Sequence, residues 1–174
     1  MQQLIGKRPN LQFLEIDATS SSQFSQSANY LQAGEPVTIL CEGLLMYLTL
    51  SEKQQVCANV REILQQHDGV WITSDFTSTI SHRQSLQDGP AYQQLTQTIS
   101  NLTGRSPDND FQTLESARQF VYEQGFHLVE HSALNVMDQL SCLNILDIQA
   151  EEVKNMLAAQ SIFVLTLTAA PTDI

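Results

Sequence analysis

Basic residues and long apolar runs are both scarce in this chain of 174 residues. Eight lysines and arginines stand against 19 aspartates and glutamates, which gives a formal charge of −11. Such an acidic chain repels phosphate backbones and anionic lipids, so we expect neither nucleic-acid binding nor membrane attachment. The apolar stretches fall far short of the roughly 20 residues that span a bilayer, and MQQLIGKRPN lacks the apolar core of a secretory signal.

Cysteine is also rare. Cys41, Cys57 and Cys142 are an odd number without C-x-x-C spacing, which disfavours a disulfide framework or a zinc site. Free thiols in a reducing compartment, with the cytoplasm as the default, are the simplest interpretation. His127 and His131 are four apart in a predicted strand, which separates them by about 13 Å. We therefore expect no metal site.

Several catalytic and phosphate-binding patterns are missing as well. The sequence contains no G-x-S-x-G nucleophile motif, no G-x-G-x-x-G turn and no P-loop. Residue patterns by themselves therefore support neither a serine hydrolase nor a phosphate cradle. A hydrophobic content of 42% with only 16% charged residues is nevertheless typical of a folded chain, and the length favours one domain, residues 1–174.

Apolar, β-branched segments alternate with amphipathic ones along the chain. This order predicts an open α/β sheet of the Rossmann-like kind with flanking helices. We expect its strands to be mostly parallel, because VTIL has the composition of a strand buried on both faces. The predicted strands are Leu11–Asp17, Pro36–Cys41, Val70–Asp75, Phe126–His131 and Ser161–Thr168.

Helical spacing of apolar residues marks the intervening segments. One helix is predicted from a cap at Ser51, with Gln54 completing a capping box, to a left-handed close at Gly69. A second begins after a Thr113 cap. Two shorter helices are predicted over residues 92–102 and Glu151–Ala159, while Leu134–Leu146 is ambiguous.

Three acids stand where predicted strands end, at the edge of an α/β sheet where ligands bind. Glu42 lies between a buried strand and Gly43, and it either caps nearby backbone N–H groups or faces a ligand. Asp17 either caps the turn into the serine-rich segment or accepts a polar ligand group. For Asp75 we favour a strand-end cap or a solvated residue. From residues alone, the prediction ends at an α/β domain with an acid-lined crevice.

The segment Val37–Leu48, VTILCEGLLMYL, resembles the leucine carboxyl methyltransferase family of S-adenosylmethionine-dependent enzymes. GVWITSDF, FLEIDA and ARQFVYEQGFHLVEHS resemble neighbouring parts of the same family, so the resemblance spans about Leu11 to Thr168. It implies a class I methyltransferase fold in which Asp17 and Ala18 contact the adenine and Glu42 lines the cofactor site. It also implies methyl transfer to an oxygen of a carboxylate or hydroxyl, without a metal and with no assigned catalytic base.

The family's N-terminal Gly-rich turn and ribose-binding acid have no counterpart here. We therefore expect a domain that is incomplete at its N-terminus and that binds the cofactor weakly or not at all when alone. The alternative is a non-catalytic remnant that acts as an interaction module. An unpaired sheet edge is a template for association, so a homodimer or a partner chain is expected at such an edge.

Overall fold

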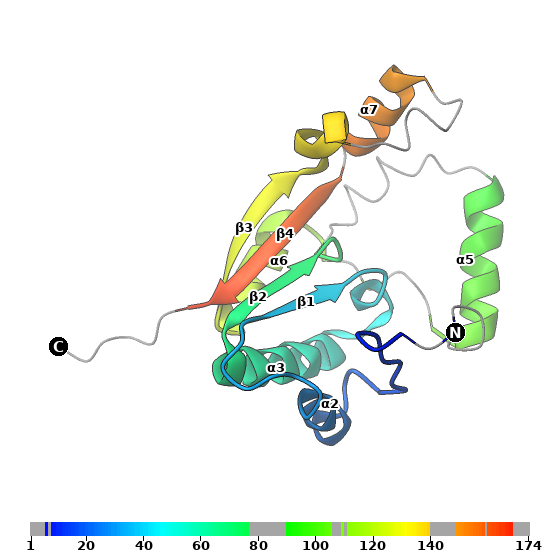
Figure 1. Cartoon of the computed structure of the whole chain (residues 1–174). Coiled ribbons are helices and arrows are strands. Elements are labelled where there is room, and N and C mark those ends of the chain that lie inside the picture. The colour runs from blue at the N-terminus through cyan, green and yellow to red at the C-terminus, as the bar shows by residue number, and fades with distance from the viewer. Residues whose placement is uncertain are drawn as a thin grey trace.

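The computed structural model describes residues 6, 8–76, 90–105, 109, 111–139, 149–158 and 160–168. Its centre is a four-stranded sheet in the order β1-β2-β4-β3 (Figure 1). The strands are β1 (Val37–Cys41), β2 (Gly69–Thr73), β3 (Phe126–Ser132) and β4 (Ser161–Leu167). The α/β class predicted from the sequence is confirmed, and these four strands agree with four predicted ones to within about two residues at each end.

One expectation about the sheet is wrong and another holds in part, because β1, β2 and β3 run in the same direction but most strand pairs are antiparallel. Only β1 and β2 pair in parallel, whereas β4 runs antiparallel to both β2 and β3. The segment Leu11–Asp17 forms no strand and makes only an isolated bridge between Arg8 and Leu11. Its apolar residues are about 40% exposed, as for Leu14 at 43%. An apolar pattern shows that a segment suits a strand, but a strand also needs a neighbouring strand to pair with.

The described part of the chain contains five helices, of which four were predicted and one, over the polar segment Ser21–Ala28, was not. They are α2 (Ser21–Ala28), α3 (Leu50–His67), α5 (Pro90–Thr103), α6 (Leu114–Glu123) and α7 (Ala150–Ala158), with 3₁₀ turns at Leu45–Tyr47 and Ala133–Gln139. Helix α3 is capped by Thr49 rather than Ser51, because Thr49 and Glu52 form the capping box. The charged Glu52 binds the Thr49 N–H at 2.8 Å. The predicted Thr113 cap is confirmed.

A close approach between the backbones of β1 and β2 sets the register of this parallel pair. The Val37 N–H donates to the Asp68 carbonyl at 3.1 Å, directly beside Gly69. Gly69 has a φ of 118°, and a Cβ there would lie 1.8 Å from the Val37 oxygen. Asp68 itself has a φ of 58°, so both residues of the turn adopt left-handed conformations. Only glycine allows the β1 backbone to approach this closely.

The core lies on one face of the sheet, under α3 and α6. Trp71, Phe126, Phe163 and Leu165 are buried there, with α3 and α6 side chains in the same cluster. On the opposite face the strand register sets an apolar row across all four strands, with Leu40, Ile72, Val164 and Val129 as neighbours. Leu40 is 72% exposed and Val129 is 43% exposed. In Figure 1 none of the described helices covers this face.

Candidate functional site at the carboxyl end of β1

The loop after β1 is anchored by a buried carboxylate from the next strand. Asp75, 7% exposed, accepts backbone N–H groups from Gly43 at 2.8 Å, Leu44 at 2.7 Å and Leu45 at 2.9 Å. Gly43 adopts a φ of 69°, which helps successive N–H groups converge on one anion. The strand-end cap favoured for Asp75 is confirmed. The sequence analysis did not predict that the Asp75 side chain is buried, although the surrounding VWITSDF is apolar enough to indicate burial.

A buried lysine fixes the same loop through a second segment. The Lys53 ammonium, on α3, donates to the Asn109 carbonyl oxygen and lies 4.7 Å from the centre of the Phe111 ring. The Asn109 N–H in turn donates to the Met46 carbonyl at 3.3 Å. Lys53 is 3% exposed and occupies the helical stripe of Val56, a position that indicated a buried lysine. The loop is therefore held from two sides.

A shallow hollow of about 240 Å³ opens beside this anchored loop. It lies between α2, α3 and the outer strand β1. Most of its lining is apolar, and the Glu42 side chain provides the carboxylate. The lining residues are Ala18, Phe24, Ile39, Leu40, Cys41, Glu42, Leu44, Val56, Val60 and Trp71.

Ala18 and Glu42 both line this hollow. The family resemblance implied that they share a cofactor site with Asp17, and binding of a cofactor there stays a prediction. The buried Asn59 of α3 donates to the Ala18 carbonyl at 2.8 Å and so fixes that wall. Glu42 follows β1 directly and is exposed at the rim. It does not cap the backbone N–H groups around it, because Asp75 occupies that position.

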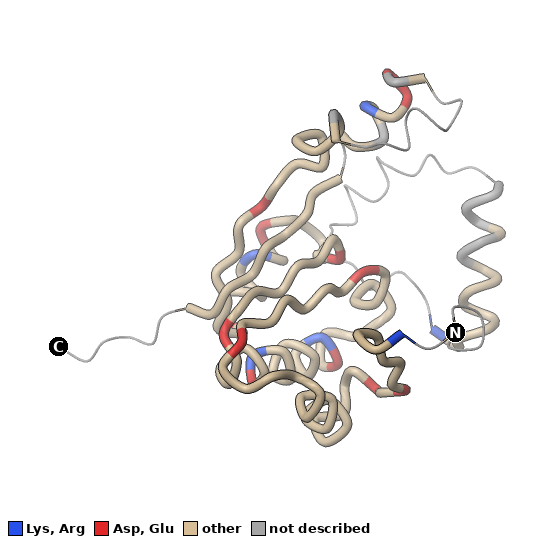
Figure 2. Tube along the Cα trace, viewed as in Figure 1, with Lys and Arg blue, Asp and Glu red and all other residues tan. Residues whose placement is uncertain are grey.

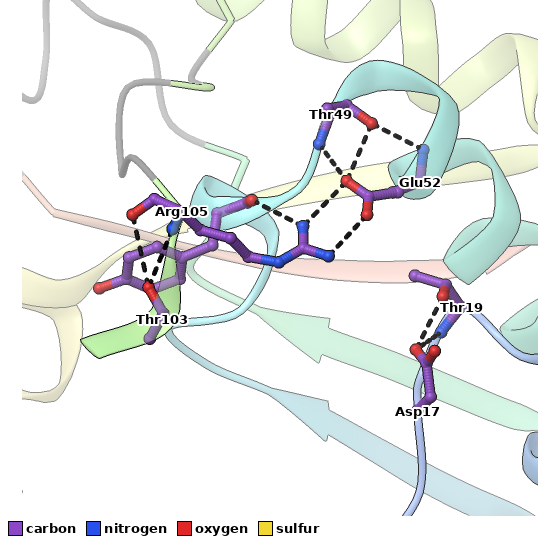
Figure 3. Close-up of polar contacts among 7 residues, drawn as sticks. Asp17, Thr19, Thr49, Glu52, Thr103 and Arg105 are labelled. Carbon is purple, nitrogen blue, oxygen red and sulfur yellow. Dashed lines mark hydrogen bonds and ion pairs between the residues drawn. The ribbon is translucent and has the colours of Figure 1, made fainter. Parts of the chain in front are cut away.

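Asp17 is not among the residues that line the hollow. Its Oδ1 accepts the Thr19 N–H at 2.9 Å and the Thr19 hydroxyl at 2.7 Å, as Figure 3 shows. These bonds, the hydroxyl first, lower the pKa of the Asp17 carboxyl. The Asp17 N–H donates to Gln23 of α2. The turn-capping alternative for Asp17 is thus the geometry observed.

A bidentate ion pair lies near Asp17, at the start of α3. Arg105 donates to both carboxylate oxygens of Glu52, at 3.0 and 2.8 Å, and to the Tyr47 carbonyl at 3.3 Å (Figure 3). The Arg105 hydrogen bonds, followed by those from Thr49, lower the pKa of Glu52 to about 2. The pair ties the end of α5 to the same capping box. The sequence prediction missed it, because nothing local links residues 52 and 105.

The environment of the two described thiols disfavours the thiolate form, which is the reactive one. Burial, followed by the charge of Asp75, raises the pKa of Cys41 to about 12. Burial likewise raises the pKa of Cys57 to about 12. The Cys41 Sγ lies 3.8 Å from Asp75 Oδ2. Both thiols are free, whereas Cys142 lies outside the described residues.

Two classes of site receive no support within the described ranges. The His, Cys, Asp and Glu side chains there form no group of three that could hold a metal ion. No described helix combines the length and apolar character needed to cross a bilayer.

No protein-family model and no curated protein matches this sequence. Among solved structures, it is similar to an O-methyltransferase family protein from Burkholderia thailandensis, with a TM-score of 0.45 and 11% identity over 91% of this chain. It is also similar to the cyclopropane synthase MmaA2 from Mycobacterium tuberculosis, with a TM-score of 0.39 and 17% identity over 84% of this chain. The chain spans 36% of the first structure's length and 66% of the second's.

Proposed function

We propose that this chain forms one wall of an S-adenosylmethionine site in an O-methyltransferase. The observation that carries the proposal is the hollow at the carboxyl end of β1, where Ala18 and Glu42 meet. Open α/β sheets bind ligands beyond the carboxyl ends of their strands. The resemblance of VTILCEGLLMYL to the leucine carboxyl methyltransferase family supports the choice of cofactor and reaction.

The hollow fits part of this cofactor. Its apolar lining suits a flat base, and the Glu42 carboxylate at the rim suits a positively charged sulfonium. The buried Trp71 Nε1–H lacks an acceptor within the described residues. However, about 240 Å³ is below the roughly 300–1,000 Å³ of typical ligand pockets. The remaining contacts must come from elsewhere.

When bound, the cofactor supplies the methyl carbon, whose bond to sulfur breaks as the bond to the acceptor oxygen forms. This chain's residues then have two tasks. Ala18 and the hollow orient the cofactor, and Glu42 attracts its positive charge. A carboxylate acceptor needs no base, whereas a hydroxyl acceptor would need one. The acceptor's identity and a cytoplasmic location stay predictions.

The test is calorimetric or NMR titration of the chain with S-adenosylmethionine. We expect weak binding, with a Kd of roughly 1 mM or about −4 kcal/mol, because the hollow is incomplete. Shifts should centre on the Ala18 and Glu42 amides. Glu42→Gln keeps the side-chain shape, removes the charge and should weaken binding by roughly 1–3 kcal/mol.

Glu35→Gln is the matched control, since Glu35 is also exposed but precedes β1. It should leave the affinity unchanged. Equal binding by the wild type and Glu42→Gln would contradict the assignment of Glu42. Low-micromolar binding would show that the hollow is already complete and that the expectation of an incomplete domain is wrong.

A second candidate function is that of an interaction module without catalysis. The observation that favours it is the outer side of β1, which pairs with no strand that the structure describes, together with the exposed Leu40. This function predicts no detectable cofactor binding under any condition, so the same titration separates the two.

A further inference from the structure

The outer side of β1 is a sheet edge that no described residue pairs with. β1 is the first strand in the sheet order and, within the described ranges, pairs with β2 alone. Because the Val37 N–H points to β2, the alternation of a parallel ladder directs the peptide groups of Thr38 and Leu40 to the free edge. Uncharged along its length, the strand VTILC lacks the lysines that normally protect an edge.

This edge also borders the hollow. Ile39, Leu40 and Cys41 of β1 supply part of its lining, so a strand added alongside them would extend that wall. Leu40 also ends the apolar row on the uncovered face of the sheet, next to Ile72. The open edge, the exposed leucine and the incomplete hollow therefore meet at one place.

Acidic residues stand at both ends of the edge. Glu35 and Asp68 flank the start of β1 and Glu42 follows its end, all three exposed, and Figure 2 shows acidic positions at both ends of the strand. Two copies pairing antiparallel about Ile39 would set Glu42 of one copy beside Pro36 and Glu35 of the other. Such clustering of like charge disfavours self-pairing and favours a strand with basic ends.

From this geometry we infer that the free edge of β1 binds an extended segment of a different protein chain, with an apolar centre and basic ends, which adds a strand to the sheet. The main-chain bonds to Thr38 and Leu40 give affinity, and the acids select the flanks. That the added strand also completes the cofactor hollow rests on the proposed function. Of the two expected kinds of association, a homodimer and a complex with a partner chain, this proposal keeps the complex with a partner chain.

The probe is a synthetic strand peptide with an apolar centre and lysines at both ends, compared with the same centre carrying glutamates. We expect the lysine peptide to bind and to slow hydrogen exchange of the Thr38 and Leu40 amides. The glutamate peptide should bind roughly tenfold more weakly or worse. Added salt should weaken the lysine peptide's binding, because the flanking charges are exposed.

Two variants of one residue block the edge in different ways. Leu40→Pro removes an edge-facing donor while sparing the bonds to β2, and Leu40→Lys adds a charge mid-strand. Both should abolish peptide binding. Val129→Lys is the matched control, because Val129 is exposed on the opposite edge strand, and it should bind the peptide as the wild type does.

The outcomes separate the two proposals. Peptide binding unaffected by Leu40→Lys, equal binding of both peptides, or self-association that Leu40→Lys disrupts would overturn the edge proposal. Binding of S-adenosylmethionine without peptide binding would leave the proposed function standing alone. Peptide binding without any gain in cofactor affinity would support the edge while counting against the hollow as a cofactor site.

Discussion

Two segments border the hollow, and the chain holds them in opposite ways. The loop after β1 is held by the buried Asp75, through bonds to three consecutive N–H groups, and by the chain around Asn109. The segment over residues 11–18 is exposed except for the half-buried Ala18, and it is connected chiefly by the Asp17 turn and by the bond from Asn59 to Ala18. One wall is rigidly anchored, while the other depends on a few surface contacts.

The difference shows that two acids near the ends of neighbouring strands have different tasks. Burying a carboxylate costs free energy unless new hydrogen bonds replace those that it makes with water. Asp75 meets that condition with backbone donors. Glu42, its neighbour in space, is thereby left exposed and unengaged at the rim. The acid that shapes the site and the acid available to a ligand are different residues.

The largest expected effect comes from removing the charge of Asp75. Asp75→Asn turns one acceptor oxygen into a donor that faces either the Gly43 N–H or the N–H groups of Leu44 and Leu45. We expect a loss of roughly 2–4 kcal/mol in the free energy of unfolding, measured by urea denaturation. Asp17→Asn is the control on the loose wall and should leave the denaturation midpoint within error. Equal losses for both variants would erase the distinction between the two walls.

The second effect tests the other clamp on the anchored loop. Lys53→Met keeps the apolar stem but removes the ammonium that binds the Asn109 carbonyl and lies over Phe111. The expected loss is about 1–2 kcal/mol of unfolding free energy. Lys154→Met, at an exposed lysine of α7, should change stability little. If Lys53→Met changes stability as little as Lys154→Met does, then Asp75 alone holds the loop.

Sequence patterns predicted the parts of this molecule whose cause is local or periodic. VTILC and GVWIT are apolar, β-branched runs, and both are strands. LQFLEID is also rich in apolar residues but forms no strand, because pairing depends on a neighbouring strand that composition does not reveal. The antiparallel placement of β4 between β2 and β3 is likewise a long-range outcome.

The candidate site divides along the same line. The family resemblance implied one site for Asp17, Ala18 and Glu42, of which Ala18 and Glu42 line the hollow and Asp17 does not. It underestimated Asp75, whose three bonds depend on how the loop after β1 folds back over β2. Arg105 lies 53 residues from Glu52, so no periodicity could have linked them.

The smallest expected effect concerns that pair, which lies beside the loose wall. Glu52 has a folded pKa of about 2 against an ordinary 4.5, so the Arg105 contact stabilises the fold above pH 4.5 and is lost as the pH falls toward 2. Both side chains are part-exposed, so solvent screens the pair. Arg105→Gln should therefore lower Tm at pH 7 by about 2 °C or less.

The shape of the pH dependence decides this prediction more clearly than its size. The Tm difference between the wild type and Arg105→Gln should shrink from pH 4.5 downward and also in high salt. Arg61→Gln is the control, because Arg61 donates to the Gln124 carbonyl, an acceptor that does not titrate. Its Tm difference should stay level over the same range. A level difference for Arg105→Gln as well would mean that Arg105 acts through the neutral Tyr47 carbonyl, and that the charge of Glu52 contributes nothing to holding the end of α5 at the start of α3.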